Sequence, residues 1–169
     1  MITIEYMKPQ YVEDVLKLER TCFGSGWTST PFNRELDRND CAYFVAKENG
    51  QIIGYSGYWL LLEELHVTIM GVNPELRNKK TGQILLIKLI REGIKNGAKW
   101  STLEVKATNI PAIKLYEKFG FTVMGRRKHY YQQDGQDALI MWTSELDSEV
   151  YQELLNNLEK EVSSLFIEE

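Results

Sequence analysis

The strongest constraint on the fold lies in three consecutive strand-like runs. Residues 43–48 and 52–61 are rich in apolar and aromatic side chains, and Asn49-Gly50 joins them. An Asn-Gly pair between two such runs is a strong signal for a β-hairpin, because both residues tolerate the positive φ of its turn. A further run covers residues 64–72. We therefore expect three antiparallel strands at the centre of the fold.

An amphipathic helix is predicted soon after these strands. In residues 82–96 the apolar side chains recur at helical spacing, and Gly97 follows at a position typical of a helix C-terminus. Residues 101–105 then alternate as a strand. The helix therefore joins two strands that can lie side by side and parallel. Since the other strands are expected to be antiparallel, the predicted fold class is α+β.

The remaining segments complete this pattern. Residues 22–31 are rich in Gly, Ser and Thr and carry Trp27, which is typical of a loop. Thr30-Pro31 indicates an N-cap followed by proline at the first helical position. A turn is expected at residues 133–135. We expect further strands at residues 2–6, 121–127 and 138–143, and further helices at residues 12–20, 32–38 and 110–118.

The C-terminal residues have a pattern of their own. Between residues 150 and 165 the apolar side chains recur at i, i+4 and i+8, which indicates an amphipathic helix. We favour packing of this helix on its own domain, and the alternative is pairing with another chain. No internal repeat or linker indicates a second globular domain. The expected organisation is one domain at residues 1–146 and a helical extension at residues 147–169.

Composition narrows the functional classes. The chain has 169 residues, of which 43% are hydrophobic and 26% charged, as is typical of one globular domain. Its formal net charge of -4 argues against a chain-wide basic surface for nucleic acid. Cys22 and Cys41 make no disulfide framework, and no Cys/His cluster has the spacing of metal ligands. No secretory signal or membrane-spanning run is recognisable, so we expect a cytoplasmic protein without membrane, metal or direct nucleic-acid partners.

The first segment suited to chemistry is the turn at residues 73–82, between a strand and a helix. Backbone N–H groups at a helix N-terminus attract anions such as a pyrophosphate. Arg77, Lys79 and Lys80 add positive charge there, although a basic loop that is merely solvated has the same composition. Gly71 in the preceding strand indicates a bulge, a close approach by a ligand, or a glycine that is simply tolerated.

The second such segment is residues 103–121. Glu104 lies on a strand, Asn109 stands where the next helix begins, and Tyr116 lies on that helix. A plain N-cap explains Asn109 equally well, and a core tyrosine with its hydroxyl at the rim explains Tyr116. Residue type and spacing alone therefore leave both interpretations open.

This segment resembles the signature of GNAT acetyltransferases. The matching positions are Asn109, Ala112, Leu115, Tyr116, Gly120 and Phe121. Residues 1–145 are similar to one branch of that family, the RimI-type ribosomal-protein N-alanine acetyltransferases. The segments that carry this similarity are residues 27–28, 32–36, 103–109, 126–131 and 137–141.

The resemblance implies a GNAT fold with acetyl-CoA as cosubstrate. The expected sheet is mixed, mostly antiparallel, of about six to seven strands and splayed in the middle, with flanking helices and an extra C-terminal helix. In this family the pantetheine arm inserts into the splay, and the turn and helix start that follow wrap the pyrophosphate. The resemblance assigns cofactor binding to Met70, Gly71, Val72, Arg77, Asn78, Lys79, Lys80, Thr81, Gly82, Gln83, Asn109 and Tyr116.

The turn departs from the family pattern Arg/Gln-x-x-Gly-x-Gly/Ala at one position. Lys80 stands where the pattern has its first glycine, whereas Gly82 matches the last position. If the site requires a positive φ, a lysine costs roughly 1–2 kcal/mol there. Its side chain either obstructs the approach of the phosphate to the backbone or attracts the diphosphate through its ammonium.

By the same resemblance, Glu104 is the general base, acting through water on the acceptor ammonium, and Tyr116 is the general acid for the departing thiolate. A backbone N–H near residues 70–72 would polarise the thioester oxygen. Positioned acid–base groups contribute about 10²–10⁴-fold in rate. The resemblance assigns the acceptor slot to three aromatic side chains, for each of which core packing is the alternative: Trp27, Tyr130 and Tyr131.

The implied reaction is acetyl transfer to a protein N-terminus, such as the N-terminal alanine of a small-subunit ribosomal protein. An α-amine titrates near 7.7–8.0 and a lysine near 10.4, so the α-amine is the easier nucleophile at neutral pH. One alternative is acetylation of lysine or of a small-molecule amine. Another is a non-catalytic binding module impaired in CoA binding, which Lys80 supports. The expected assembly is a monomer or a weak homodimer.

Overall fold

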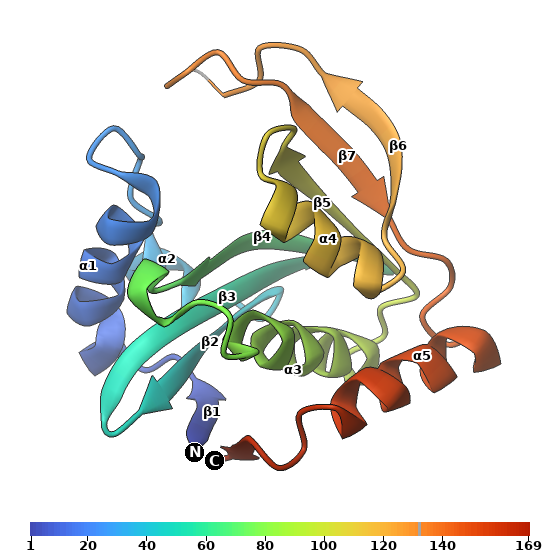
Figure 1. Ribbon diagram of the computed structural model, residues 1–169, viewed down its shortest axis with the longest axis horizontal. Coiled ribbons are helices and arrows are strands. Elements are labelled where there is room, and N and C mark those ends of the chain that lie inside the picture. The colour runs from blue at the N-terminus through green and yellow to red at the C-terminus, as the bar shows by residue number, and fades with distance from the viewer. Residues whose placement is uncertain (132) are drawn as a thin grey trace.

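The computed structural model describes residues 1–131 and 133–169 and shows one sheet with helices on both faces (Figure 1). Its strands are β1 (Ile2–Tyr6), β2 (Cys41–Glu48), β3 (Gln51–Leu61), β4 (Glu64–Val72), β5 (Trp100–Lys106), β6 (Thr122–Arg127), β7 (Ala138–Trp142) and β8 (Phe166–Glu168). Within the described residues these eight strands are ordered β6-β7-β5-β4-β3-β2-β1-β8. The predicted sheet has about six to seven strands, and β8 is an additional strand that the sequence does not predict.

The helices form two layers. They are α1 (Val12–Phe23), α2 (Phe32–Glu35), α3 (Thr81–Lys95), α4 (Ile110–Lys118) and α5 (Glu149–Lys160), with short 3₁₀ turns at Pro9–Tyr11 and Pro74–Leu76. The α1 face of the sheet is covered by α1 and α2, and the α3 face by α3, α4 and α5. The predicted order of elements is confirmed, and α4 has the predicted bounds.

The pairing is mixed and mostly antiparallel. Strands β1 to β4 pair antiparallel, β5 joins β4 in parallel, and β7 lies antiparallel between β5 and β6. The predicted hairpin between β2 and β3 is confirmed, with Asn49 at φ 51° and Gly50 at φ 78°. These positive φ values explain the choice of Asn-Gly at the turn.

The sheet splays in its middle. The ladder between β4 and β5 extends only to Val67 and Leu103. Beyond it, β4 continues to Val72 and β5 to Lys106. A β-bulge at Thr68 shifts the register between β3 and β4 at the same level. Because a bulge bends its strand and increases the twist, β4 turns away from β5 there, and the predicted splay is confirmed.

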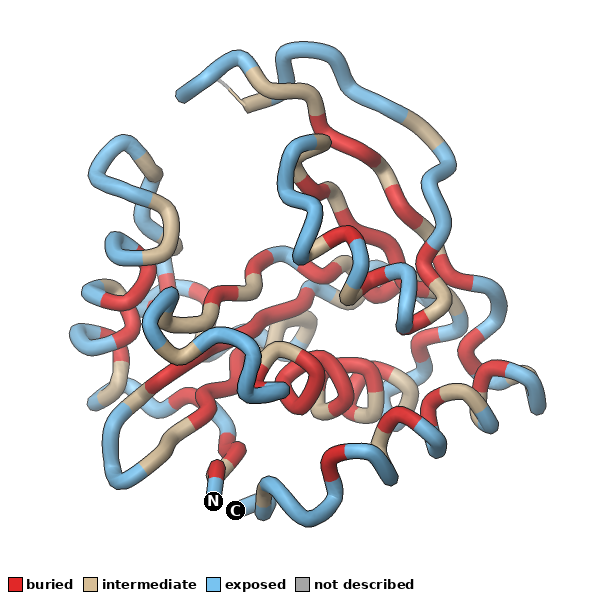
Figure 2. Tube along the Cα trace, in the orientation of Figure 1, coloured by how far each residue is buried: buried red, intermediate tan, exposed pale blue. Residues whose placement is uncertain are grey.

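The core on the α3 face is mostly aliphatic. Four consecutive side chains of α3, Ile84 to Ile87, are completely buried, and so are Leu89 and Ile90. Figure 2 shows most of α3 as buried. Full burial of such a side chain stabilises the fold by about 1.5–3 kcal/mol. Helix α3 is therefore held by the apolar pattern that its sequence displays.

The α1 face buries more carboxylates than the α3 face, on which Glu92 of α3 is 9% exposed and accepts a hydrogen bond from the Tyr6 hydroxyl. Glu19 is 1% exposed and accepts hydrogen bonds from the Thr30 hydroxyl at 2.5 Å and from Tyr55 at 3.1 Å. The prediction that Thr30 is an N-cap is therefore wrong, since its side chain is directed to Glu19. Pro31 takes the N-cap position of α2 without a side-chain cap. Helix α2 ends at Glu35, earlier than predicted.

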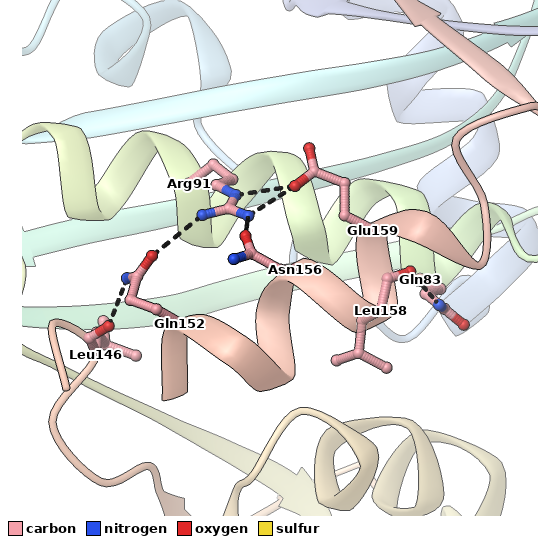
Figure 3. A network of polar contacts seen from close by, with 7 residues as sticks. All are labelled: Gln83, Arg91, Leu146, Gln152, Asn156, Leu158 and Glu159. Atoms are coloured by element: carbon pink, nitrogen blue, oxygen red, sulfur yellow. Dashed lines mark hydrogen bonds and ion pairs between the residues drawn. The ribbon is translucent and has the colours of Figure 1, made fainter. Parts of the chain in front are cut away.

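The C-terminal extension docks on its own domain, as the favoured interpretation expected. Leu155, Leu158 and Val162 join the core of the α3 face. Arg91 of α3 donates to Glu159 of α5 at 2.7 Å (Figure 3). The chain then continues into β8, which pairs in parallel with β1 and brings the two termini together (Figure 1). Since β8 has only three residues, it offers too few positions for alternation to be recognised.

Candidate active site

The opening between β4 and β5 is part of a cavity of about 960 Å³. Strands β4 and β5 line it together with α1, α3 and α4. The structure brings together most of the residues that the sequence analysis singled out. These are Trp27, Met70, Gly71, Val72, Arg77, Asn78, Lys80, Thr81, Gly82, Gln83, Glu104, Asn109, Tyr116 and Tyr131.

Two of the predicted site residues lie outside this lining. Lys79 extends toward the end of β2, where its Nζ is 4.0 Å from Glu48. Tyr130 is 43% exposed and packs edge-on against Tyr131, with ring centroids 5.2 Å apart. A hydrogen bond to Glu104 raises the pKa of Tyr130, so this phenol contacts the predicted base rather than the cavity. Neighbouring residues of a turn point in different directions, which the sequence does not reveal.

The end of the cavity at α3 is shaped by left-handed backbone. Asn78 has φ 67° and Lys80 has φ 68°, so the positive φ that the family pattern implies is present despite the lysine. Helix α3 begins without a side-chain cap, and the buried hydroxyl of Thr81 has no partner within the described residues. Free N–H groups at a helix N-terminus favour an anion. Together with Arg77, this end therefore fits a diphosphate.

Gly71 is explained mainly by packing. An added Cβ would lie 2.7 Å from the Tyr55 ring and 3.2 Å from the sulfur of Cys22, which leaves no space for a side chain. The bulge in β4 is at Thr68 instead. Gly71 nevertheless lines the cavity through its backbone. Tyr55 and Cys22 thus leave space only for glycine at position 71.

The predicted base occupies the α1 face of β5. Leu103 and Val105 are buried in the core of the α3 face, so the alternation of the strand directs Glu104 to the opposite side. The Glu104 side chain is 29% exposed, and its Oε1 lies 3.3 Å from Nη2 of Arg127. This carboxylate is therefore paired but still accessible to solvent, which allows proton transfer through a water molecule.

The predicted acid reaches the cavity from the α3 face. Tyr116 of α4 is 8% exposed and packs edge-on against Phe121 at a centroid distance of 5.8 Å. Burial, with a smaller contribution from Tyr131, raises the pKa of Tyr116 well above its ordinary value. Burial and the charge of Glu104 raise the pKa of Tyr131 to about 12. Both phenols therefore keep their protons at neutral pH and are available as donors.

Asn109 is both the N-cap of α4 and part of the cavity lining, so the two interpretations of this residue are compatible. Its side chain caps α4 by accepting from the Ala112 N–H at 3.3 Å, and the residue also lines the cavity. Sequence reasoning missed three lysines of the lining, Lys106, Lys114 and Lys118. The last two lie one helical turn apart on α4, a spacing that could have indicated a shared surface.

The described part of the chain holds neither a candidate metal site nor a candidate membrane-spanning helix. In residues 1–131 and 133–169 no group of His, Cys, Asp and Glu side chains is arranged to hold a metal ion. None of the helices in these residues combines the length and apolarity that crossing a membrane requires.

Comparison with known proteins relates this geometry to a family. Residues 12–121 match the model of the acetyltransferase (GNAT) family. A Bacillus subtilis (strain 168) relative, provisionally named as a ribosomal protein bS18-alanine N-acetyltransferase, is 34% identical over 142 residues, covering 83% of this chain and 94% of its own. The Escherichia coli (strain K12) ribosomal protein bS18-alanine N-acetyltransferase is 36% identical over 100 residues, covering 58% of this chain and 68% of its own.

Solved structures agree. The crystal structure of the Escherichia coli ribosomal-protein-S18-alanine N-acetyltransferase has a TM-score of 0.76 at 28% identity, covering 85% of this chain and 93% of its own. Arabidopsis thaliana NAA60 in complex with acetyl-CoA has a TM-score of 0.77 at 17% identity, covering 88% of this chain and all 100% of its own, which shows the shared fold. This chain therefore belongs to the GNAT acetyltransferase family, with acetyl-CoA as its cosubstrate.

Proposed function

We propose that this protein is an N-alpha-acetyltransferase that acetylates a protein N-terminus, with the N-terminal alanine of ribosomal protein bS18 as acceptor. The observation that carries the proposal is the meeting of Glu104 and Tyr116 in one cavity, reached from opposite faces of the splayed sheet. The similarity to relatives named for this reaction supports the acceptor. Acceptor and cosubstrate can thus enter from different sides.

The residues of the cavity would hold the cosubstrate along its length. The backbone of residues 70–72, free of β5 at this level, would align the pantetheine arm. The start of α3, with Arg77 and Lys80 beside it, would hold the phosphates. When bound, acetyl-CoA supplies an acetyl group activated as a thioester. No described side chain then has to form a covalent bond to that group.

Three proton transfers accompany the reaction. Glu104 accepts a proton from the acceptor ammonium through a water molecule, which leaves a free amine. The amine nitrogen forms a bond to the acetyl carbonyl carbon, and the bond between that carbon and sulfur breaks. Tyr116 gives its proton to the departing thiolate, and the second proton lost by the attacking nitrogen, passed on through water, restores the phenol. A backbone N–H of residues 70–72 polarises the carbonyl oxygen during the attack.

The chemistry of the α1 side suits a peptide end. Trp27 stacks on Phe23 at 4.7 Å and lines the cavity, and its indole N–H has no partner within the described residues. This N–H can donate to a peptide carbonyl, and Tyr131 forms another wall. An α-amine titrates near 7.7–8.0, so a single hydrated carboxylate is a sufficient base, whereas a lysine near 10.4 demands more.

A competition assay tests the proposal. The full chain receives acetyl-CoA and two peptides in equal amounts, one with a free N-terminal alanine and no lysine, the other N-terminally blocked with an internal lysine. Mass spectrometry should find the acetyl group on the first peptide, and far less with Glu104→Gln. Preferred modification of the lysine peptide would contradict the proposal. Modification of neither peptide, with acetyl-CoA still bound, would also do so.

A further inference from the structure

The C-terminal extension contributes an acid to the phosphate end of the cavity. Oε2 of Glu161 lies 2.7 Å from Nζ of Lys118, 3.1 Å from Nε2 of Gln83 and 3.8 Å from Nζ of Lys80. All three partners line the cavity, whereas Glu161 lies in the residues that follow α5. The family match ends at residue 121, so this carboxylate belongs to a segment outside it.

The position of Glu161 is fixed from both sides. Leu158 is 3% exposed and Val162 is completely buried in the core of the α3 face. Gln83 also donates to the backbone carbonyl of Leu158 at 2.9 Å (Figure 3). The backbone on either side of Glu161 is therefore anchored, and its carboxylate is held beside the start of α3.

The charge of Glu161 matters because it engages two of the few cations in the cavity lining. The lining of this end includes Arg77, Lys80, Lys114 and Lys118, and Glu161 engages two of them. Hydrogen bonds from Lys118 and then Gln83 keep the pKa of Glu161 below its ordinary value, so the group is ionised at neutral pH. A carboxylate and a phosphate use the same ammonium donors.

We propose that Glu161 is an intramolecular counter-anion that competes with the phosphates of acetyl-CoA for Lys80 and Lys118, so that the C-terminal extension lowers the affinity for the cosubstrate. The inference rests on the proposed function only in that acetyl-CoA binds at this end. Glu161 acts through the lysines and is a determinant of affinity, not a catalytic residue. The opposite role, in which Glu161 orients these lysines toward the phosphates, predicts an effect of opposite sign.

Calorimetric titration with acetyl-CoA distinguishes the two signs. Glu161→Gln keeps the shape of the side chain and removes its charge, and we expect the Kd to fall about three- to tenfold at low salt. The difference should shrink at high salt, because exposed charges are screened.

Glu159→Gln is the matched control, since Glu159 lies in the same extension but pairs with Arg91, which is not part of the lining. Its Kd should equal that of the wild type. An unchanged or raised Kd for Glu161→Gln would overturn the inference.

A ligand without phosphates completes the test. S-acetylpantetheine carries the same thioester, so Glu161→Gln should leave its affinity unchanged. A gain for this ligand equal to the gain for acetyl-CoA would contradict competition with phosphate. Thermal unfolding without ligand checks that the variant is folded. Because the readout is binding, a wild type that acetylates no peptide would refute the proposed function and leave this inference open to the same titrations.

Discussion

The two faces of the sheet both have apolar cores, but the α1 face buries more acids than the α3 face. On the α3 face, α3 and α5 bury aliphatic side chains such as Ile84, Leu85 and Leu155 without any exposure. On the α1 face, buried acids accept hydrogen bonds from phenols of other elements, Glu19 from Tyr55 and Glu35 from Tyr43. The α3 face has one such pair among the described residues, in which Glu92 accepts from Tyr6. The α3 face carries the end of the cavity to which we assign the phosphates, and the α1 face carries Glu104 and the loop with Trp27.

Under the proposed function, this difference would suit the two substrates. The cosubstrate is large and constant, and the close-packed, mostly aliphatic layer would give it a rigid support. The acceptor side consists of a loop held by hydrogen bonds, because Glu19 also accepts from the Thr30 backbone N–H at 3.1 Å. Contacts of this kind fix a loop without the long apolar pattern that a helix needs.

The largest expected effect concerns the base on the α1 face. Glu104→Gln should lower kcat/KM for an N-terminal alanine peptide by about 10²–10⁴-fold, because the amide cannot accept the proton. Initial rates at saturating acetyl-CoA measure the loss. The Kd for acetyl-CoA should stay the same, since the phosphate end is untouched. A loss of less than tenfold would assign the base to another group.

A core substitution on the α3 face should act on stability instead. Leu85 is completely buried in α3, and Leu85→Ala should lower the free energy of unfolding by about 2–5 kcal/mol through lost burial and the cavity left behind. Urea denaturation followed by circular dichroism measures this change. A change below about 1 kcal/mol, which is the effect of an ordinary substitution, would mean that the core around Leu85 is less rigid than its full burial implies.

The α1 side should account for a sensitivity to acid. Glu5 of β1 is 3% exposed, and its carboxylate pairs with Lys47 at 2.6 Å and with Lys8 at 2.8 Å. Burial by itself would raise the pKa of Glu5, but hydrogen bonds from Lys47, Lys8 and Tyr11 outweigh it and lower the pKa to about 2. A depressed folded-state pKa stabilises the fold above the unfolded-state value near 4.3, and this contribution is lost as the pH falls toward 2.

Glu5→Gln should therefore destabilise the protein by on the order of 2–3 kcal/mol at pH 7. The difference from the wild type should shrink as the pH is lowered through that window. Urea denaturation at several pH values measures both curves. A difference that is independent of pH would show that Glu5 stabilises the fold by packing rather than by charge.

The smallest expected effect lies at the turn before α3. Lys80 adopts φ 68°, where glycine is not strained, so Lys80→Gly should raise the free energy of unfolding by about 0.5–1 kcal/mol. The gain is limited because glycine also has more freedom in the unfolded chain. Thermal unfolding of both proteins measures it. A destabilised variant would show that the ion pair of Lys80 with Glu161 outweighs the backbone strain.

The predictability of the fold follows the same division between the faces. The helix expected at residues 82–96 is α3 at Thr81–Lys95, because a long apolar period leaves little freedom of interpretation. Thr30 was misassigned because its partner Glu19 lies on another element, and no local pattern reveals a tertiary contact. Likewise β8 depends on the distant strand β1 rather than on its own three residues.

The site was predictable where a spaced signature exists. Asn109 and Tyr116 are predicted from such a signature and Glu104 from the similar strand before it; all three line one cavity in the structure, and their roles stay predictions. A positive φ at Lys80 is expected if the family's glycine at this position is required for its backbone conformation, and the structure has this φ. Glu161 was not foreseen, because its link to Lys118 joins residues 43 positions apart in the chain.

The central claim is that acetyl-CoA lies in the opening between β4 and β5. Amide hydrogen exchange with and without acetyl-CoA, read by mass spectrometry, tests this claim most directly. We predict slower exchange on binding in residues 68–72 and 78–84, and no change in β1 and β2. Unchanged exchange in both of these segments, with protection elsewhere in the chain, would contradict the account.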